Sequence, residues 1–426
     1  MKIEVNEKPG ELRFLFVLDK DDGFSSGKVR MANKSVTFQV PDDFNGMIHP
    51  DLVALTAILC CHPFVGTKLQ LPMPVSRHFL SEARRVITKY SIIGKNSEEI
   101  VPRRPPQNSR PGLAFSGGVD STAALCVMPP STIPIFLKRP KRKGSLYDYS
   151  AALKSCDLLS EVGFDVHTMV SDLEYLRDPV GFPTDLAHAS PAVLLSDYLG
   201  IDTIAFGTVL ESAFGIGHES FRDYPKMSHW RFFGTLFSAA GIPISLPVAG
   251  ISEVGTSMIV ERSPIGHVAQ SCIRGTWGSP CWNCWKCFRK GILGISLGIY
   301  DIGEINIDLM LKSNEVGKKL SQIPISHENV ISYSLERADI SKHRYLAGLH
   351  EMVTIDFPLD FLEKWYPPSI SLIQDKWKKS VRRKILGILN PMSEDEEEIV
   401  RKWTLMEGEG DISKRRRDLE NLGVFS

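Results

Sequence analysis

The residues most suited to chemistry form the run Ser116-Gly117-Gly118-Val119-Asp120-Ser121. An apolar, strand-like segment precedes the run, and a helix-like segment follows it. A turn of this kind directs several backbone N–H groups, and the positive end of a helix dipole, at one point. Gly117 and Gly118 let the backbone approach an anion without an intervening Cβ. The pattern therefore predicts a loop that binds phosphate.

The side chains of this loop have matching chemical uses. Ser116 and Ser121 can add hydroxyl donors, and Asp120 can hold a metal ion, Mg²⁺, on the phosphates. No lysine follows the glycines, so the loop is not of the Walker type. An ordinary tight turn is the alternative, but the whole six-residue signature between a strand and a helix favours function.

A second group of reactive residues consists of Cys272, Cys281, Cys284 and Cys287, with the spacing C-x8-C-x2-C-x2-C. Four thiolates can close a tetrahedral zinc site, and short C-x2-C spacing lets two of them reach one ion from a single turn. The pattern favours structural Zn²⁺. Thiols without metal, disulfides and an iron–sulfur cluster are the alternatives.

The loop resembles the signature of the ATP pyrophosphatase (PP-loop) superfamily. Those enzymes cleave ATP between its α and β phosphates, transfer AMP to a substrate oxygen and let a nucleophile displace the AMP. The resemblance implies that Asp120, Ser116 and Ser121 act in catalysis. From the loop and the neighbouring strand ends we expect ATP to contact Phe115, Ser116, Gly117, Gly118, Asp120, Ser121, Thr122, Leu137, Gly207 and Thr208.

The loop and the four cysteines together resemble 7-cyano-7-deazaguanine synthase, the QueC-type branch, over roughly residues 110–292. The resemblance implies an AMP-forming ligase that adenylates the carboxylate of a 7-carboxy-7-deazaguanine-like substrate and passes the acyl group to an amine. QueC-like proteins with extensions also occur in bacterial anti-phage operons, which implies an amine of a partner protein. Ammonia, giving the nitrile of queuosine-type biosynthesis, is the alternative acceptor.

Two departures from the family leave the acceptor open. The basic run 138–143 stands where the family carries a Tyr-Gly-Gln-type turn, and Glu253 stands near an expected lysine. The basic run could neutralise phosphates, contact tRNA or form a solvated loop.

A reading without catalysis stays open as well. The cysteine segment carries aromatic and basic residues that could bind RNA on an inactive nucleotide fold: Arg274, Trp277, Trp282, Trp285, Lys286, Phe288, Arg289 and Lys290.

The segment 211–229 is long for a connection within a compact domain and is typical of a substrate lid. Its aromatic, basic and acidic groups suit a heterocycle with a carboxylate. We expect substrate contacts from His188, which lies in a predicted helix, and from His218, Glu219, Arg222 and Tyr224.

These groups require a scaffold that alternates strands and helices. Strands are expected at 113–115, 132–137, 165–170, 203–206 and 243–248, and helices at 121–128, 148–162, 187–199 and 230–240. This rhythm predicts an α/β fold with a parallel sheet covered on both faces and ligands beyond the carboxyl ends of the strands.

The predicted organisation has four parts: an N-terminal α+β extension (1–100), a proline-rich linker (101–111), a PP-loop domain (112–292) with the zinc segment 272–287, and a helical C-terminal extension (293–426). In the first part, Asp51 is expected to cap a helix over 51–61, and a second helix is expected over 81–90. In the last part, Ser393 and Glu396 form a capping box.

Composition sets limits on partners. Lys and Arg total 50, as do Asp and Glu, so the whole chain has no general attraction for nucleic acid. No segment is apolar over the about 18 residues that a membrane span needs, and the first residues lack a signal-peptide core. We expect a cytoplasmic protein that acts on a 7-deazaguanine-type small molecule and has no membrane contact. A partner protein, nucleic acid and a homodimer are left open.

Overall fold

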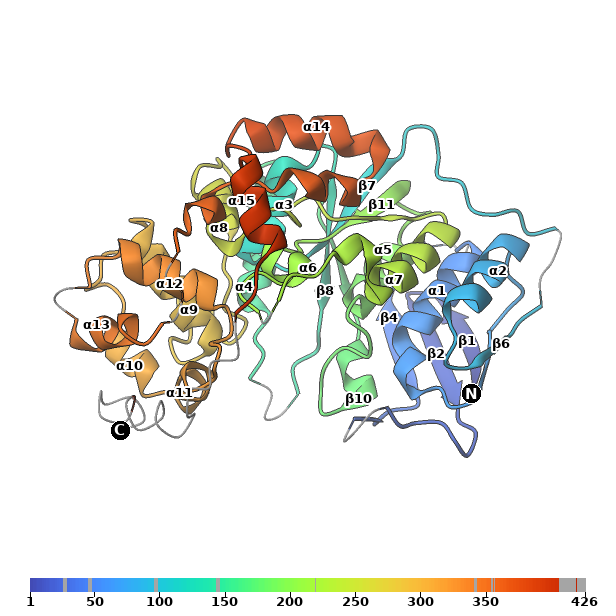
Figure 1. Cartoon of the computed structure of the whole chain (residues 1–426). Helices are drawn as coiled ribbons and strands as arrows, with labels where there is room; N and C mark the ends of the chain where they lie inside the picture. The colour runs from blue at the N-terminus through green and yellow to red at the C-terminus, as the bar shows by residue number, and fades with distance from the viewer. Residues whose placement is uncertain are drawn as a thin grey trace.

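The computed structural model describes residues 1–25, 29–44, 48–95, 99–142, 146–218, 220–340, 343–353, 355, 357–405 and 419. The fold is mixed α/β and is built around a central parallel sheet (Figure 1). The order of this sheet is β12-β11-β7-β8-β9, and every neighbouring pair is parallel. Its strands are β7 (Arg110–Phe115), β8 (Ile133–Lys138), β9 (His167–Val170), β11 (Ile201–Ala205) and β12 (Ile244–Ser245).

The central strands lie near their expected positions because they are continuous apolar runs, as strands covered on both faces must be. In chain order the sheet reads 5-4-1-2-3, the arrangement of the first five strands of a doubly wound sheet. The strand order reverses between β7 and β11. Such sheets bind ligands beyond the carboxyl ends of the strands at this reversal.

Helices cover both faces of the sheet. They are α3 (Val119–Val127), α4 (Ser150–Glu161), α5 (Ser190–Leu194), α7 (Ser228–Ala239) and α8 (Glu253–Glu261). The expected helix 187–199 was wrong in extent. A 3₁₀ turn (Ala187–Ala189) precedes α5, and turns that close at Gly200, with φ of +63°, follow it.

The N-terminal part forms a second sheet with the order β4-β2-β1-β5-β6. Its strands are β1 (Lys2–Lys8), β2 (Glu11–Val17), β4 (Ser35–Gln39), β5 (Lys68–Gln70) and β6 (Ser91–Ile93), accompanied by α1 (Pro50–Cys61) and α2 (Arg77–Val86). β3 (Arg30–Met31) pairs with β10 (Arg177–Asp178), which follows β9. One continuous apolar core joins this part to the central sheet.

Asp51 does not cap α1, contrary to expectation. His49 is the cap, and its Nδ1 accepts from the Asp51 N–H. The buried Asp51 carboxylate instead accepts from the Ser76 N–H (2.8 Å) and Oγ (2.7 Å). Ser76 in turn caps α2, which therefore begins at Arg77 and not at residue 81.

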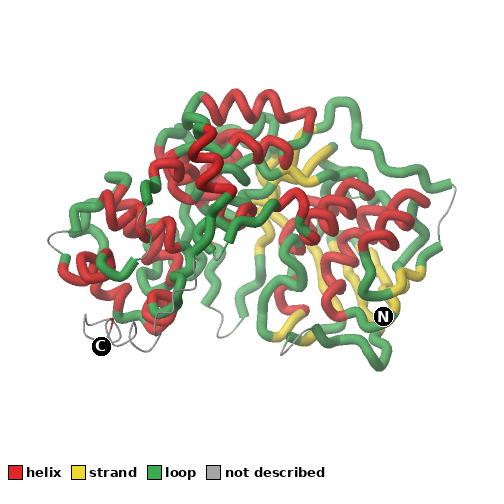
Figure 2. Tube along the Cα trace, viewed as in Figure 1, coloured by secondary structure: helices red, strands yellow, loops and turns green. Residues whose placement is uncertain are grey.

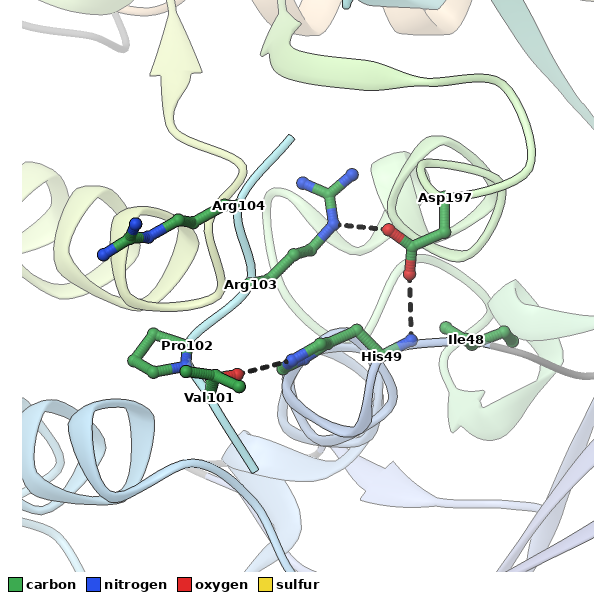
Figure 3. A pocket seen from close by; sticks show the side chains of 7 residues that line it. All are labelled: Ile48, His49, Val101, Pro102, Arg103, Arg104 and Asp197. Carbon is green, nitrogen blue, oxygen red and sulfur yellow. Dashed lines mark hydrogen bonds and ion pairs between the residues drawn. The ribbon is translucent and has the colours of Figure 1, made fainter. Parts of the chain in front are cut away.

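The segment 101–111 is anchored by one buried side chain, as Figure 3 shows. Arg103 Nε donates to Asp197 (2.6 Å), and its two other nitrogens donate to the carbonyl oxygens of Gly241 and Ile201 (2.7 and 2.9 Å). Asp197 also accepts from the His49 N–H (2.9 Å). Arg103 therefore ties the N-terminal part to the central sheet, whereas its neighbour Arg104 is exposed.

The chain beyond the cysteines packs in two places. In the described part of the chain, five helices pack with the cysteine segment around one apolar core at one end of the molecule (Figure 1). They are α9 (Trp285–Ser296), α10 (Ile307–Leu311), α11 (Asn314–Leu320), α12 (Glu328–Arg337) and α13 (Arg344–His350).

The chain then returns to the central sheet, where α14 (Asp375–Leu386) and α15 (Glu394–Arg401) lie (Figure 2). Lys384 of α14 donates to the Cys126 and Met128 carbonyl oxygens at the end of α3. The capping box of α15 is confirmed, because Ser393 and Glu396 bond each other's backbone N–H groups. The two halves of this region thus serve different neighbours.

Candidate functional site

The Ser116–Ser121 loop joins β7 to α3 at the reversal of strand order. Gly117 has φ of +76°, and Gly118 is the N-cap of α3 without a side-chain cap. Ser116 Oγ and Ser121 Oγ lie 3.0 Å apart. The loop therefore presents hydroxyls and helix N–H groups, the donors that an anion requires.

Donors from distant segments converge beside Gly118. A Cβ built there would lie 3.5 Å from Ser116 Oγ, 3.8 Å from Ser271 Oγ and 3.9 Å from Lys286 Nζ. Lys286 has no hydrogen bond or ion pair with the described residues. Lys286 as a residue is half-buried, so its ammonium is a cation available to an anion at this point.

The cysteine segment is fastened to the loop immediately before its first cysteine. The Gln270 N–H donates to the Gly117 carbonyl oxygen (2.8 Å), and Ser271 Oγ accepts from the Val119 N–H (3.2 Å). Order in the cysteine segment and order in the loop are therefore coupled.

Asp120 is held at one oxygen. Its Oδ1 accepts from Thr256 Oγ1 (3.0 Å) and lies 3.4 Å from Lys290 Nζ. Oδ2 has no hydrogen bond with the described residues. That oxygen suits a hard cation such as Mg²⁺, which prefers carboxylate oxygen and water.

Lys290 links the loop to a buried charge network. It lies 3.2 Å from Glu253, which also forms a bidentate pair with Arg289 (3.0 and 2.7 Å). His327 Nε2 lies 3.6 Å from the same carboxylate. Lys290 and Arg289 outweigh the cost of burial and hold the pKa of Glu253 well below its usual range, whereas burial lowers the pKa of His327 to about 4. Glu253 is therefore a buried anion that positions Lys290.

Glu211 contacts this network, but its pKa is shifted in the opposite direction from that of Glu253. Both its oxygens accept from the Glu253 N–H (3.1 Å), and Asn329 Nδ2 donates to one of them (3.0 Å). Burial, with the nearby Glu253 charge, raises the pKa of Glu211 to about 8. Glu211 therefore carries a proton at neutral pH.

A cavity of about 540 Å³ opens over the loop. Ser116, Gly118, Asp120, Ser121 and Lys286 line one end, and Gly207 and Thr208, which follow β11, lie beside them. A Cβ on Gly207 would lie 2.7 Å from the Ser121 nitrogen and 2.8 Å from the Asp120 carbonyl. Only glycine lets the end of β11 approach the first turn of α3 so closely.

The wall of this cavity also carries a chain of polar groups. Tyr224 Oη lies 2.8 Å from His229 Nδ1, and His229 Nε2 lies 3.1 Å from Asp185 Oδ2. His229 donates from one ring nitrogen to the carboxylate and accepts at the other. This arrangement can pass a proton from Tyr224. Arg222 and His188 line the same cavity.

A smaller cavity, about 120 Å³, lies against the other side of Ser116 and His188. Phe115 and Leu137 line it, with Arg139 from the basic run. Arg139 pairs with Glu174 (2.5 Å) and stacks on Tyr147. Arg142 stacks on Tyr175. These two arginines are therefore engaged by neighbouring side chains, and Lys143 lies outside the described residues.

Some expected contacts do not line either cavity. Thr122 is fully buried, and its Oγ1 has no partner among the described residues. The His218 ring packs on His327. Glu219 lies outside the described residues. The segment 211–229 is also not one loop. It includes most of α6 (Leu210–Phe214), a 3₁₀ turn (Tyr224–Lys226) and the start of α7.

The four cysteines form a compact cluster. Their sulfur atoms lie within 4.8 Å of one another, and those of Cys281 and Cys287 are 3.8 Å apart. A tetrahedral Zn²⁺ with Zn–S bonds of about 2.3 Å separates its sulfurs by about 3.8 Å. The donor set therefore fits a zinc ion. Trp285 and Phe288 are buried beside the cluster and cannot stack on bases.

Comparisons add little about function. Residues 232–404 match the model of a family of unknown function, DUF6395. This part includes the cysteines, Glu253, Lys286 and Lys290, but not the loop at 116–121. No curated protein and no solved structure matches the chain. Within the described part of the chain, no helix is long and apolar enough to cross a membrane.

Sequence reasoning missed the role of Lys286, Lys290 and Ser271 at the loop. Lys286 and Lys290 are four residues apart on α9, so they share one helix face. That spacing was visible. Which part of the protein this face of α9 contacts depends on how the cysteine segment folds, and no local sequence pattern reveals that.

Proposed function

We propose that this protein is an ATP-dependent, AMP-forming carbon–nitrogen ligase. The observation that carries the proposal is the convergence of loop N–H groups, Ser116, Ser271 and Lys286 beside Gly118, in a doubly wound sheet at its ligand-binding edge. The β and γ phosphates of ATP would bind there. Asp120 Oδ2 would help to hold Mg²⁺, which neutralises phosphate charge when it is bound.

The first step is adenylation of a carboxylic acid. A carboxylate oxygen attacks the α phosphorus, the bond to the β-phosphate oxygen breaks, and pyrophosphate leaves. The loop N–H groups and Lys286 stabilise the leaving charge, because they are fixed before the reaction begins. Asp120, Ser116 and Ser121 orient the triphosphate.

The second step transfers the acyl group to nitrogen. An amine attacks the acyl carbon, its bond to the AMP oxygen breaks, and the amine loses a proton. The chain Tyr224–His229–Asp185 lies on the cavity wall and could accept that proton. Burial raises the pKa of Tyr224 to about 12, so its hydroxyl would pass a proton to His229 and not act as a free phenolate.

The substrate and acceptor follow from the resemblance to QueC-type enzymes. The acid would be 7-carboxy-7-deazaguanine or a close analogue. We favour an amine of a partner protein in an anti-phage defence system, because the additional N- and C-terminal regions offer surface to a macromolecule. Ammonia is the alternative acceptor: it gives an amide, which a second ATP-dependent activation would dehydrate to the nitrile. Zinc on the four cysteines would be structural, because four thiolates leave no open position.

Pyrophosphate release from ATP, with and without 7-carboxy-7-deazaguanine, tests the proposal. We expect acid-dependent release by the wild type and a loss of at least about a hundredfold in Asp120→Ala. Asp301→Ala, an exposed aspartate outside the site, is the matched control. No release by folded, zinc-loaded wild type, together with tight RNA binding, would support the binding protein without catalysis.

A further inference from the structure

A further cavity, about 440 Å³, lies on the side of α9 that carries Lys286 and Lys290. Val119 and Ser271 of the loop region also line it, so it adjoins the phosphate site. Lys286 lines both this cavity and the 540 Å³ cavity. The two spaces therefore meet at one ammonium group.

Aromatic rings form much of the wall of this 440 Å³ cavity. Trp277, Trp282 and Tyr300 line it. The rings of Trp282 and Tyr300 stand 6.5 Å apart at 83°. This edge-to-face contact fixes Trp282, and the half-buried Trp277 and Trp282 leave ring surface on which a flat ligand can stack.

Two glycines of α9 leave room for these rings. A Cβ on Gly294 would lie 2.4 Å from the Tyr300 ring, and one on Gly291 would lie 3.5 Å from Trp282. Trp282 itself has φ of +49°, a conformation that costs a bulky residue free energy. Its neighbours in the cysteine cluster hold it there. The surrounding structure therefore fixes the position of Trp282.

The two lysines that line the cavity differ in their ion pairs. Lys290 is neutralised by Asp120 and Glu253. Lys286 has no such partner among the described residues. An incoming ligand would therefore meet aromatic walls and the available ammonium of Lys286, with His267 and the exposed Glu261 also on the lining.

We propose that this cavity binds a planar aromatic carboxylate, with its ring between Trp277 and Trp282 and its carboxylate on Lys286. The inference deepens the proposed function, on which it rests, by assigning the acid and ATP to different cavities. Two anions must meet for adenylation, and a lysine between them lowers their repulsion. The residues Arg222 and Tyr224 would then face nucleotide and amine, not the acid.

Calorimetric titration of the zinc-loaded full chain, without nucleotide, tests this assignment. The probes are 7-carboxy-7-deazaguanine, indole-3-carboxylate and indole. We expect both acids to bind, and indole at least about tenfold more weakly. Trp277→Leu should weaken both acids about tenfold, within the range of ring stacking on one aromatic side chain. Trp377→Leu, on α14 and outside this cavity, is the matched control.

The outcomes separate this inference from the proposed function. Equal affinity of Trp277→Leu and wild type, with zinc content unchanged, would overturn the assignment. So would a Trp277→Leu enzyme whose KM for the acid is unchanged while Arg222→Ala raises it tenfold. Acid binding that depends on Trp277 in a protein that releases no pyrophosphate would support the cavity and overturn the ligase.

Discussion

At the scale of single residues, the account rests on groups that converge from distant parts of the chain. The sequence indicated the loop itself, because a strand, two glycines and a helix are local features. It did not indicate that Ser271 and Lys286, which lie more than 140 residues further along the chain, reach this loop. Their approach to Gly118 depends on tertiary packing.

Gly207→Ala tests the contact between the end of β11 and the first turn of α3. Its Cβ would lie 2.7 Å from the Ser121 nitrogen and would push the loop out of place. We expect at least about a tenfold loss of ATP affinity, measured by titration with a slowly hydrolysed analogue. Gly303→Ala, where a Cβ meets nothing within 4 Å, should bind normally. Equal affinities for the two variants would contradict the close approach.

The raised pKa of Glu211 predicts that the stability of the folded protein depends on pH. Its pKa is raised to about 8 in the folded protein, above the ordinary value of 4.5. The folded state therefore binds the proton more tightly. The stability that this proton contributes is full below about pH 4.5 and is lost as pH rises towards 8.

Melting temperatures at pH 5.5 and 8 should show this loss. Wild type should lose more stability over the interval than Glu211→Gln, whose neutral amide needs no proton. Glu7→Gln, an exposed change on β1, should follow wild type. The same change in melting temperature between pH 5.5 and 8 for wild type and Glu211→Gln would contradict the claim that Glu211 is protonated in the folded protein.

At the scale of secondary structure elements, the parallel strands were predictable because their apolar runs are buried on both faces. The segment 187–199 was not, since a 3₁₀ turn and tertiary contacts replace most of the expected helix. Asp51 has the chemistry of a helix cap, yet Ser76 offers it two donors that are distant in sequence.

Cys284→Ser tests the coupling of the cysteine cluster to the helices that follow. Zinc binding can contribute about 10–16 kcal/mol of folding free energy, so losing one ligand should release the metal and loosen α9–α13. Zinc analysis and limited proteolysis of residues 272–350 check this. Cys126→Ser, outside the cluster, should keep its zinc. Full zinc content and unchanged protease resistance in Cys284→Ser would show that Cys284 is not a zinc ligand, and absence of zinc from the wild type would argue against a metal site.

At the scale of the whole molecule, the N-terminal part, the central sheet and the returning α14 are joined by buried polar contacts. The composition of the segment 101–111 favoured a linker, but it could not show that Arg103 reaches three acceptors. The returning path of α14 and α15 was equally invisible, because amphipathic helices do not specify which surface they cover.

Arg103→Ala should destabilise the protein by about 2–4 kcal/mol, because it strands a carboxylate and two carbonyl oxygens. Urea unfolding measures the effect. Arg104→Ala changes the exposed neighbour and should stay within about 0.5 kcal/mol of wild type. Similar unfolding midpoints for both variants would show that Arg103 does not join the two parts.

The central claim is that the loop at 116–121 directs cleavage between the α and β phosphates of ATP. Phosphorus NMR of the products formed with 7-carboxy-7-deazaguanine and an amine tests it most directly. The account predicts AMP and pyrophosphate, turnover of β,γ-methylene ATP and none of α,β-methylene ATP. Release of ADP and inorganic phosphate would contradict it.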